Sequence, residues 1–348
     1  MAYTTINKSS EHFNTKLYTG TGSTNAITGV GFQPDWVWLK ERAGAGGHNI
    51  FDAVRGVTKV IYSNGTNAES TEAQALTTFG TDGFTLGTNT NVNESGMSMV
   101  GWNWKANGAG SANTDGSITS TVSANTTSGF SIVSYTGNGT AGATVGHGLG
   151  VAPKMIIIKR LNSSSNWMVY HSGLGGADHH IWLDLTTDIG TDTNSWNNTA
   201  PTSTVFSMGN RSENNASGGT YIAYCFADVV GYSKIGSYVG NGSSDGVFCF
   251  TGFKPAFILM KRSDTANSYD NWYIFDNKRD GFNPNNKKIA PNISDAESSD
   301  TGLFDLLSNG FKLRTTNSNN NGSGGNFIYM AIAEAPLVGS NNIPCTAR

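Results

Sequence analysis

The sequence predicts an all-β protein made of three tandem β-sandwich repeats, jelly-roll-like and of about 100 residues each. Short apolar runs bounded by Gly, Asn, Asp and Ser recur along the 348-residue chain, which contains 44 glycines. Such runs are typical of β-strands joined by turns. Apolar residues do not recur at the spacing of an amphipathic helix. Four sequence features also return three times in the same order, which indicates internal repetition.

The most regular of these features is a glycine, a proline three residues later, an apolar run and a lysine. The glycine suits a turn, and the proline suits the first residues of a strand, where no ladder hydrogen bond is lost. We interpret the lysine as the end of a strand that reaches solvent. The repeat motif consists of Gly31, Pro34 and Lys40, of Gly150, Pro153 and Lys159, and of Gly252, Pro255 and Lys261.

The other three features are a turn before this motif and two apolar runs after it. The turn begins at Tyr18, Tyr135 and Tyr238 and has the pattern Tyr-x-Gly-x-Gly. The closing run of the first repeat places Val100, Trp102 and Trp104 at alternating positions. Period 2 puts these large side chains on one face of a strand, which we expect to point inward.

The repeats predict the division of the chain. A polar stretch without aromatic residues, which separates the first two repeats, is expected to be a linker or an extra strand. The expected boundaries are an N-terminal arm at 1–14, repeats at 15–106, 129–230 and 231–336, the linker or extra strand at 107–128, and a C-terminal tail at 337–348. The run Met155–Ile158 is apolar on both faces, which predicts a strand covered on both sides by the next repeat or the next subunit.

Composition argues against several classes of function. A formal net charge of −3 and the absence of a basic cluster give no electrostatic case for binding nucleic acid. No run reaches the ~18 apolar residues of a membrane-spanning helix, so we expect no membrane insertion. The N-terminus lacks the pattern of a signal peptide, which predicts that the chain is made in a cytoplasm and does not leave it by that route. Cys225, Cys249 and Cys345 lack metal-site spacing, and the first two lie inside apolar runs and are expected to be buried thiols.

Candidate catalytic and cofactor sites are weak in this sequence. The glycine-rich turns lack the GK[ST] ending of a phosphate loop, so no cofactor is expected. His179 and His180 are adjacent and would point to opposite faces of a strand, which argues against a shared metal ion. Asp52 and Asp276 could form the carboxylate pair of a glycosidase. Because each recurs as Asp-x-x-Arg, we favour a turn or a salt bridge there, and we expect no enzyme.

Tryptophan is concentrated in the first repeat, at positions 36, 38, 102 and 104. Core packing accounts for most of these residues. An aromatic platform for a sugar ring or a protein partner stays open for one or two of them.

Five segments together resemble a family of proteins encoded by marine tailed bacteriophages. They are TDGSITSTVSANTTSGFSIVSYTGNGT, GHGLGVAPKMIIIKR, TYIAYCFADVVGYSKIGSYVGNGS, TGFKPAFILMKR and LLSNGFKLR. The resemblance extends from about Leu17 to the C-terminus, and the first repeat is the most divergent. It implies a virion component, in the manner of tail-fibre or other particle-surface proteins, but it brings no catalytic residue.

Two interpretations of the function follow. In the first, the chain is a structural virion protein, either a tail appendage or a capsid decoration, assembled in the host cytoplasm. Its expected partners are other virion proteins, further copies of itself in a homo-oligomer, and a glycan or protein receptor on the host surface. The alternative is a tail-associated carbohydrate-active enzyme, a polysaccharide depolymerase.

Overall fold

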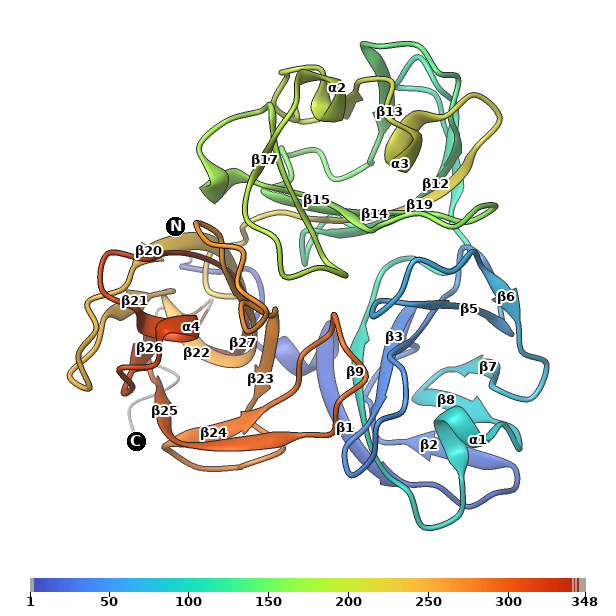
Figure 1. The fold of residues 1–348 in the computed structure, drawn as a ribbon. Helices are drawn as coiled ribbons and strands as arrows, with labels where there is room; N and C mark the ends of the chain where they lie inside the picture. Colours follow the sequence, from blue (N-terminus) through green and yellow to red (C-terminus); the bar gives the residue numbers. More distant parts are fainter. Residues whose placement is uncertain (1–2, 340, 342, 344–348) are drawn as a thin grey trace.

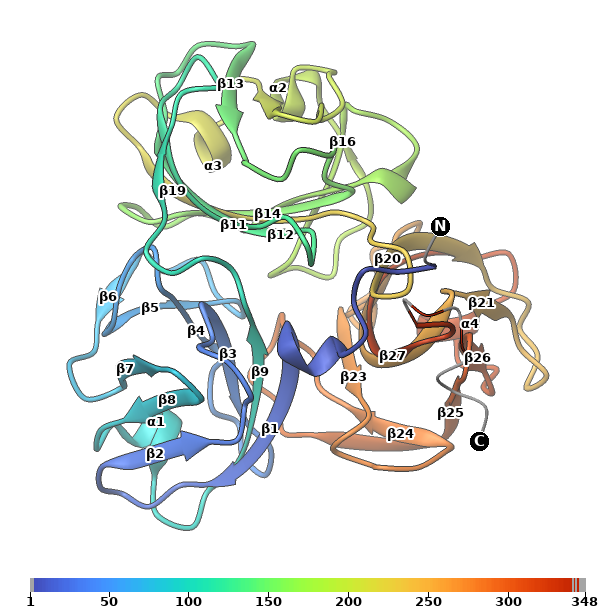
Figure 2. The same ribbon diagram turned by 180° about the vertical axis from the view of Figure 1, so that it is seen from behind.

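The computed structural model describes residues 3–339, 341 and 343. The predicted all-β fold is confirmed, since strands dominate and the α-helices of the described part are four single turns. The strands of the described residues form six sheets, and neighbouring strands within each sheet pair antiparallel. Figures 1 and 2 show three lobes around a common centre, with the large sheet of each lobe facing that centre.

The first lobe, unit 1, covers residues 13–104 and pairs a large sheet of order β1-β9-β3-β4-β5-β6 with a small sheet of order β2-β8-β7. Its elements are β1 (Phe13–Thr19), β2 (Asn25–Thr28), β3 (Trp36–Glu41), β4 (Asn49–Asp52), β5 (Lys59–Tyr62), β6 (Ser70–Thr71), β7 (Leu76–Gly80), β8 (Gly83–Leu86), α1 (Thr90–Asn93) and β9 (Ser98–Trp104).

The second lobe, unit 2, covers residues 111–226 and has a large sheet of order β10-β11-β12-β19-β14-β15-β16-β17 and the small pair β13-β18. Its elements are β10 (Ser111–Asn113), β11 (Ser120–Asn125), β12 (Phe130–Thr136), β13 (Ala143–Gly146), β14 (Met155–Arg160), β15 (Met168–His171), the 3-10 turn η2 (Ser172–Leu174), β16 (His179–Trp182), β17 (Gly190–Thr191), α2 (Thr193–Trp196), β18 (Val205–Met208), α3 (Ser212–Asn215) and β19 (Thr220–Phe226).

The third lobe, unit 3, covers residues 233–336 and combines a sheet of order β20-β27-β22-β23 with one of order β21-β26-β25-β24. Its elements are β20 (Ser233–Val239), β21 (Phe248–Phe250), β22 (Phe253–Arg262), β23 (Tyr273–Asp276), β24 (Asn285–Lys288), β25 (Ser298–Leu307), β26 (Gly310–Leu313), α4 (Ser318–Asn321) and β27 (Asn326–Pro336).

The three large sheets share one strand order. In each, the strand that carries the Tyr turn pairs with the last strand of the unit, and that last strand pairs with the strand of the proline motif. The stretch 107–128, for which a linker and an extra strand were both open, contains β10 and β11, and β11 pairs with β12 along its whole length. This stretch therefore extends the large sheet of unit 2.

The central strands are covered on both faces, as the apolar run of β14 predicts. Ile156 and Ile158 pack inside unit 2, against its small sheet. Met155 and Ile157 point the other way, into a core that also contains Trp36, Trp38 and Phe257 from the other units. Side chains two residues apart lie on the same face of a strand, so one strand serves two cores. The neighbouring units cover the second face.

The described part of the N-terminal arm, from Tyr3 onward, lies on unit 3. The Tyr3 hydroxyl donates to the Gly252 carbonyl at 2.9 Å, and Ile6 is buried. A 3-10 turn, η1 (Ser9–Glu11), then leads directly into β1. In the C-terminal tail predicted at 337–348, residues 340, 342 and 344–348 lie outside the described residues, and so does Cys345.

Candidate functional site

The three lysines of the repeat motif do not reach solvent, so that expectation was wrong. Lys40, Lys159 and Lys261 are fully buried, and burial lowers the pKa of each ammonium group to about 8. Their Nζ atoms donate to main-chain carbonyls instead. Lys40 bonds Gly44 O at 3.0 Å, Lys159 bonds Ser165 O at 2.6 Å, and Lys261 bonds Asp270 O at 2.5 Å.

The glycines and prolines of the motif have the backbone roles expected of them, with one difference. Gly31, Gly150 and Gly252 all have positive φ, which explains why a glycine starts each copy. Pro34 and Pro153 precede their strands. Pro255, by contrast, lies inside β22, where the pairing with β27 shifts register on both sides of it. A bulge of this kind accommodates a residue that has no N–H to give to the ladder.

The residue two positions after each lysine links its unit to a neighbour. Glu69 N of unit 1 donates to Leu161 O of unit 2 at 2.8 Å, Ile189 N of unit 2 donates to Ser263 O of unit 3 at 3.0 Å, and Glu297 N of unit 3 donates to Arg42 O of unit 1 at 2.8 Å. These three bonds have equivalent partners and close a ring. The repeat motif is therefore the joint between the units.

Indole and imidazole donors repeat the same cycle at the residue before β4, β15 and β23. Trp167 Nε1 of unit 2 donates to Tyr62 O of unit 1 at 2.9 Å, and Trp272 Nε1 of unit 3 donates to Trp182 O of unit 2 at 2.8 Å. His48 of unit 1 occupies the corresponding position, with its Nε2 3.0 Å from Ala290 O of unit 3. Trp36, Trp38, Trp102 and Trp104 are buried in the central core, so core packing accounts for them.

A second triplicated element was missed in the sequence: Asn-x-Ser-Gly, at 93–96, 215–218 and 321–324. Its asparagine is buried behind the Tyr turn in every unit. In unit 2, Asn215 Oδ1 accepts from Asn138 N at 3.0 Å, while its Nδ2 donates to Thr140 O and Gly209 O at 2.9 and 2.7 Å. Alignment of the residues just before the three closing runs would have revealed this motif. Its asparagine fixes a turn and binds no ligand in this arrangement.

Asp52 and Asp276 form buried salt bridges, which confirms the favoured interpretation of Asp-x-x-Arg. Arg55 Nε lies 2.5 Å from Asp52 Oδ2, and Arg279 Nε lies 2.6 Å from Asp276 Oδ2. Each carboxylate also accepts a bond from another unit, from Tyr224 Oη at 2.8 Å onto Asp52 and from Trp102 Nε1 at 3.0 Å onto Asp276. Both aspartates therefore hold units together.

The histidines near Asp178 do not converge. His180 Nδ1 is 3.0 Å from the Ser195 hydroxyl, whereas His179 Nδ1 is 2.6 Å from Leu174 O. Among residues 3–339, 341 and 343, no group of three or more His, Cys, Asp or Glu side chains could hold a metal ion. Helices long and apolar enough to cross a membrane are likewise absent from this part of the chain.

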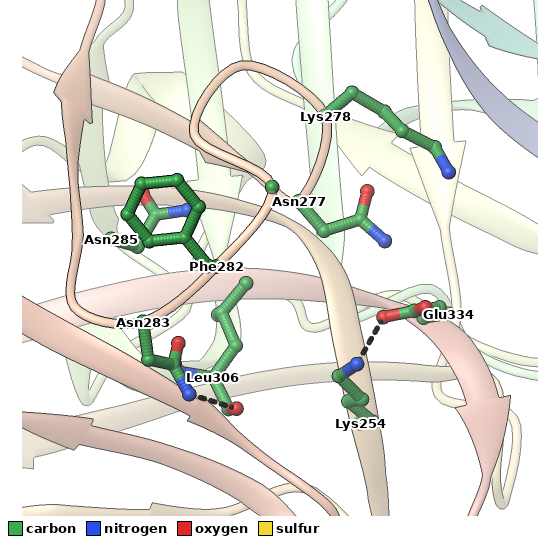
Figure 3. Close-up of a pocket in the computed structure, with 9 residues that line it drawn as sticks. Lys254, Asn277, Lys278, Phe282, Asn283, Asn285, Leu306 and Glu334 are labelled. Atoms are coloured by element: carbon green, nitrogen blue, oxygen red, sulfur yellow. Dashed lines mark hydrogen bonds and ion pairs between the residues drawn. The ribbon is translucent and has the colours of Figure 1, made fainter.

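The best candidate site is a surface pocket of about 370 Å³ on unit 3, lined mainly by the loop between β23 and β24. Lys254 and Glu334 form one wall, where their side chains make an ion pair at 2.9 Å (Figure 3). The loop supplies most of the other wall, with Asn277, Lys278 and Phe282. A small hollow lined by Phe13 and Asn14 of unit 1 shares Asn277, Lys278 and Glu334 with the pocket.

The loop that shapes this pocket is held at both ends. Asp280 Oδ2 accepts from the backbone N–H groups of Asn286 and Lys287 at 2.5 and 2.8 Å. Asn283 pairs with the main chain of Leu306, donating to its carbonyl and accepting from its N–H, both at 2.9 Å. The lining side chains are thus carried on a fixed frame.

A second hollow, of about 400 Å³, lies between units 2 and 3 and is lined by Gly173, Leu174, Ile189, Ser237, Tyr238, Val239, Ser263, Asn326 and Phe327. None of these side chains carries a charge, so this hollow offers fewer specific contacts than the pocket of unit 3.

Comparison with known proteins identifies a family for this chain. Residues 8–336 match the family described as a domain of unknown function, DUF7483. No curated protein and no solved structure matches the chain.

Proposed function

The chain belongs to the DUF7483 family, and we propose that it is a structural protein of a bacteriophage particle surface that contacts the host. The observation that carries this proposal is the ring of hydrogen bonds between the units. Equivalent polar groups of the three repeats are used to join the units, so the internal repetition serves a rigid three-lobed body. A rigid body suits a part that transmits contact between a particle and a surface.

The pocket of unit 3 supports the host-contact part of this proposal. It opens on the surface of unit 3 and is carried by a loop whose ends are fixed. Its lining combines an exposed aromatic ring with amide and charged groups. Pockets that mix one apolar surface with a few fixed polar groups are typical ligand sites. Several copies on one particle would add weak contacts through avidity.

The resemblance to bacteriophage proteins supplies the setting of this proposal, and the location on the particle is what an experiment must test. We would label intact particles of a phage encoding this chain with antibodies carrying gold. Label on the tail would support a host-contact role, and label on the head would support decoration of the capsid. Absence of label on intact and opened particles would overturn the proposal.

The depolymerase alternative has its own test. Purified full-length protein is incubated with host surface polysaccharide, and the length of the sugar chains is followed by size-exclusion chromatography. Unchanged chains are expected of an adhesive structural protein. The control is the same polysaccharide incubated without protein. Sugar chains shortened only in the presence of the protein would replace the structural proposal by an enzymatic one.

A further inference from the structure

Phe282 presents an aromatic face in the pocket of unit 3. Its side chain is 74% exposed, and burial in the fold therefore contributes little to its position there. The faces of an aromatic ring are electron-rich, and they attract the electropositive edges of C–H bonds. One side of a pyranose ring presents such C–H bonds. Phe282 therefore offers a stacking surface for a sugar ring.

Two amide oxygens in the same pocket lack partners. Asn285 is only 1% exposed, and its Nδ2 donates to Asp276 O at 2.9 Å, while its Oδ1 has no hydrogen-bond partner within the described residues. Asn277 Oδ1 is likewise buried and without a partner in that part of the chain. Buried polar atoms are nearly always hydrogen-bonded. Both oxygens can only accept, and both are enclosed by protein atoms, so they make the base of the pocket polar but are not open to a ligand.

Charge adds a second condition on the ligand. The pocket contains Lys254 and Lys278 against a single carboxylate, Glu334, and the ion pair of Lys254 with Glu334 leaves one positive charge in excess. Lys278 makes no salt bridge with any described residue, and it extends from the loop beside Asn277 (Figure 3). An ammonium group without a partner favours a ligand that carries a carboxylate.

We propose that this pocket binds an acidic saccharide, a unit of the uronic acid class, stacked on Phe282. Its carboxylate pairs with the exposed ammonium group of Lys278. The inference rests on the proposed function, because surface polysaccharide is the ligand that a host-contacting particle protein meets. It gives that contact a chemical identity and a place in unit 3.

The test is isothermal titration calorimetry of the full-length protein with uronic acid oligosaccharides. A panel of galacturonate, glucuronate, mannuronate and guluronate trimers covers the common ring geometries. The methyl ester of each trimer keeps the ring and removes the charge. We expect at least one acidic trimer to bind, and its methyl ester to bind about tenfold more weakly, a change of about 1.4 kcal/mol.

Three variants assign the binding to the pocket. Phe282→Ala is expected to weaken binding of the acid and of the ester about tenfold, because stacking serves both. Lys278→Gln is expected to weaken only the acid. Phe250→Ala, a change at an aromatic residue that is 59% exposed on β21 and outside the pocket, is the control and should leave binding unchanged. All three residues are largely exposed, so folding is expected to persist.

The outcomes separate this inference from the proposed function. Failure of every acidic trimer to bind, or equal loss in Phe250→Ala and Phe282→Ala, would overturn the saccharide site while leaving the labelling result intact. Equal binding of acid and ester would overturn the preference for a carboxylate. Binding that follows the predicted pattern, together with particles that carry no label, would overturn the virion role and leave the site standing.

Discussion

Units 1 and 2 place different kinds of side chain at equivalent positions of the joint between units, ionic in unit 1 and mainly apolar in unit 2. Where β4 ends, unit 1 has Asp52, Arg55 and Glu69 in a buried ionic network. The corresponding residues of unit 2 are His171, Leu174 and Ile189, and unit 3 repeats the ionic set as Asp276, Arg279 and Glu297.

The neighbouring unit is bonded in either case. Asp52 accepts from Tyr224 of unit 2, and His171 Nε2 lies 3.1 Å from Tyr329 O of unit 3. The three positions change together because a buried arginine without its carboxylates would be an unpaired charge. The joint therefore needs a satisfied polar group between units, and the ionic form is one of two ways to supply it.

The largest effect is expected when one member of an ionic set is replaced by its unit 2 counterpart. Arg279→Leu leaves Asp276 buried without its counter-charge, and we expect a loss of about 3–5 kcal/mol in the free energy of unfolding. Arg314→Leu is the matched control, since Arg314 is exposed and its pair with Asp305 should contribute under about 1 kcal/mol. Chemical denaturation measures both. Equal losses of unfolding free energy in the two variants would show that the buried network stabilises the fold no more than an exposed ion pair does.

The next largest effect is expected in the pH dependence of the free energy of unfolding, which should distinguish His171 of unit 2 from the ionic sets of units 1 and 3. Burial lowers the pKa of His171 to about 4, so between pH 6.5 and 4 the unfolded chain binds a proton that the folded chain refuses. The contribution of this group is complete above pH 6.5 and is lost as pH falls to 4, by up to about 3 kcal/mol. His171→Gln should lack that part of the decline. Identical pH profiles of the two proteins would contradict the assignment.

Asp276 is expected to respond in a lower range. Burial acts to raise its pKa, but Arg279 and several hydrogen bonds act more strongly, and the net effect is a lowered pKa. Its stabilising contribution is therefore complete above about pH 3.9 and is lost as pH falls through the folded value. The comparison predicts loss of the unit 2 joint before loss of the unit 3 joint during acidification.

The repeat lysines should behave alike where the ionic sets differ. Because burial lowers the pKa of Lys159 to about 8, the unfolded chain holds one proton more above that pH. The free energy of unfolding of the parent protein should therefore rise by about 2 kcal/mol between pH 8 and 9.5, and Lys159→Met should lack this rise. Lys40→Met and Lys261→Met should show the same difference. A rise confined to one unit would break the equivalence of the three joints.

The smallest effect is expected when the whole ionic set is exchanged. The triple variant Asp52→His, Arg55→Leu and Glu69→Ile gives unit 1 the residues of unit 2, and we expect it to stay within about 1 kcal/mol of the parent protein. Arg55→Leu alone should cost several times more. If the triple variant unfolds as readily as the single one, the two chemistries are not interchangeable.

The fold class follows from the sequence because alternating side chains and turn residues are local properties. Met155–Ile158 even indicates that both faces of its strand are covered. The ring could not be predicted, since it depends on which neighbour each strand meets. The burial of Lys40 was missed for the same reason: a lysine at a strand end is usually solvated, and the carbonyls that accept from this one are brought to it by the folded loop.

The pocket of unit 3 was also out of reach of the sequence. Asn277, Phe282 and Asn285 are ordinary loop residues in a chain rich in asparagine, and no spacing sets them apart. Their side chains come together at one pocket because Asp280 and Asn283 fix the loop between β23 and β24.

The joint between Arg42 and Glu297 makes time a factor in folding, because these residues are 255 positions apart. A ribosome that adds about 5–20 residues per second takes roughly 13–50 seconds to make that interval. Until unit 3 is complete, the parts of units 1 and 2 that are already made expose apolar surface that unit 3 will later cover. The nascent chain must therefore remain soluble in an unclosed form, and premature release would leave that surface open to aggregation.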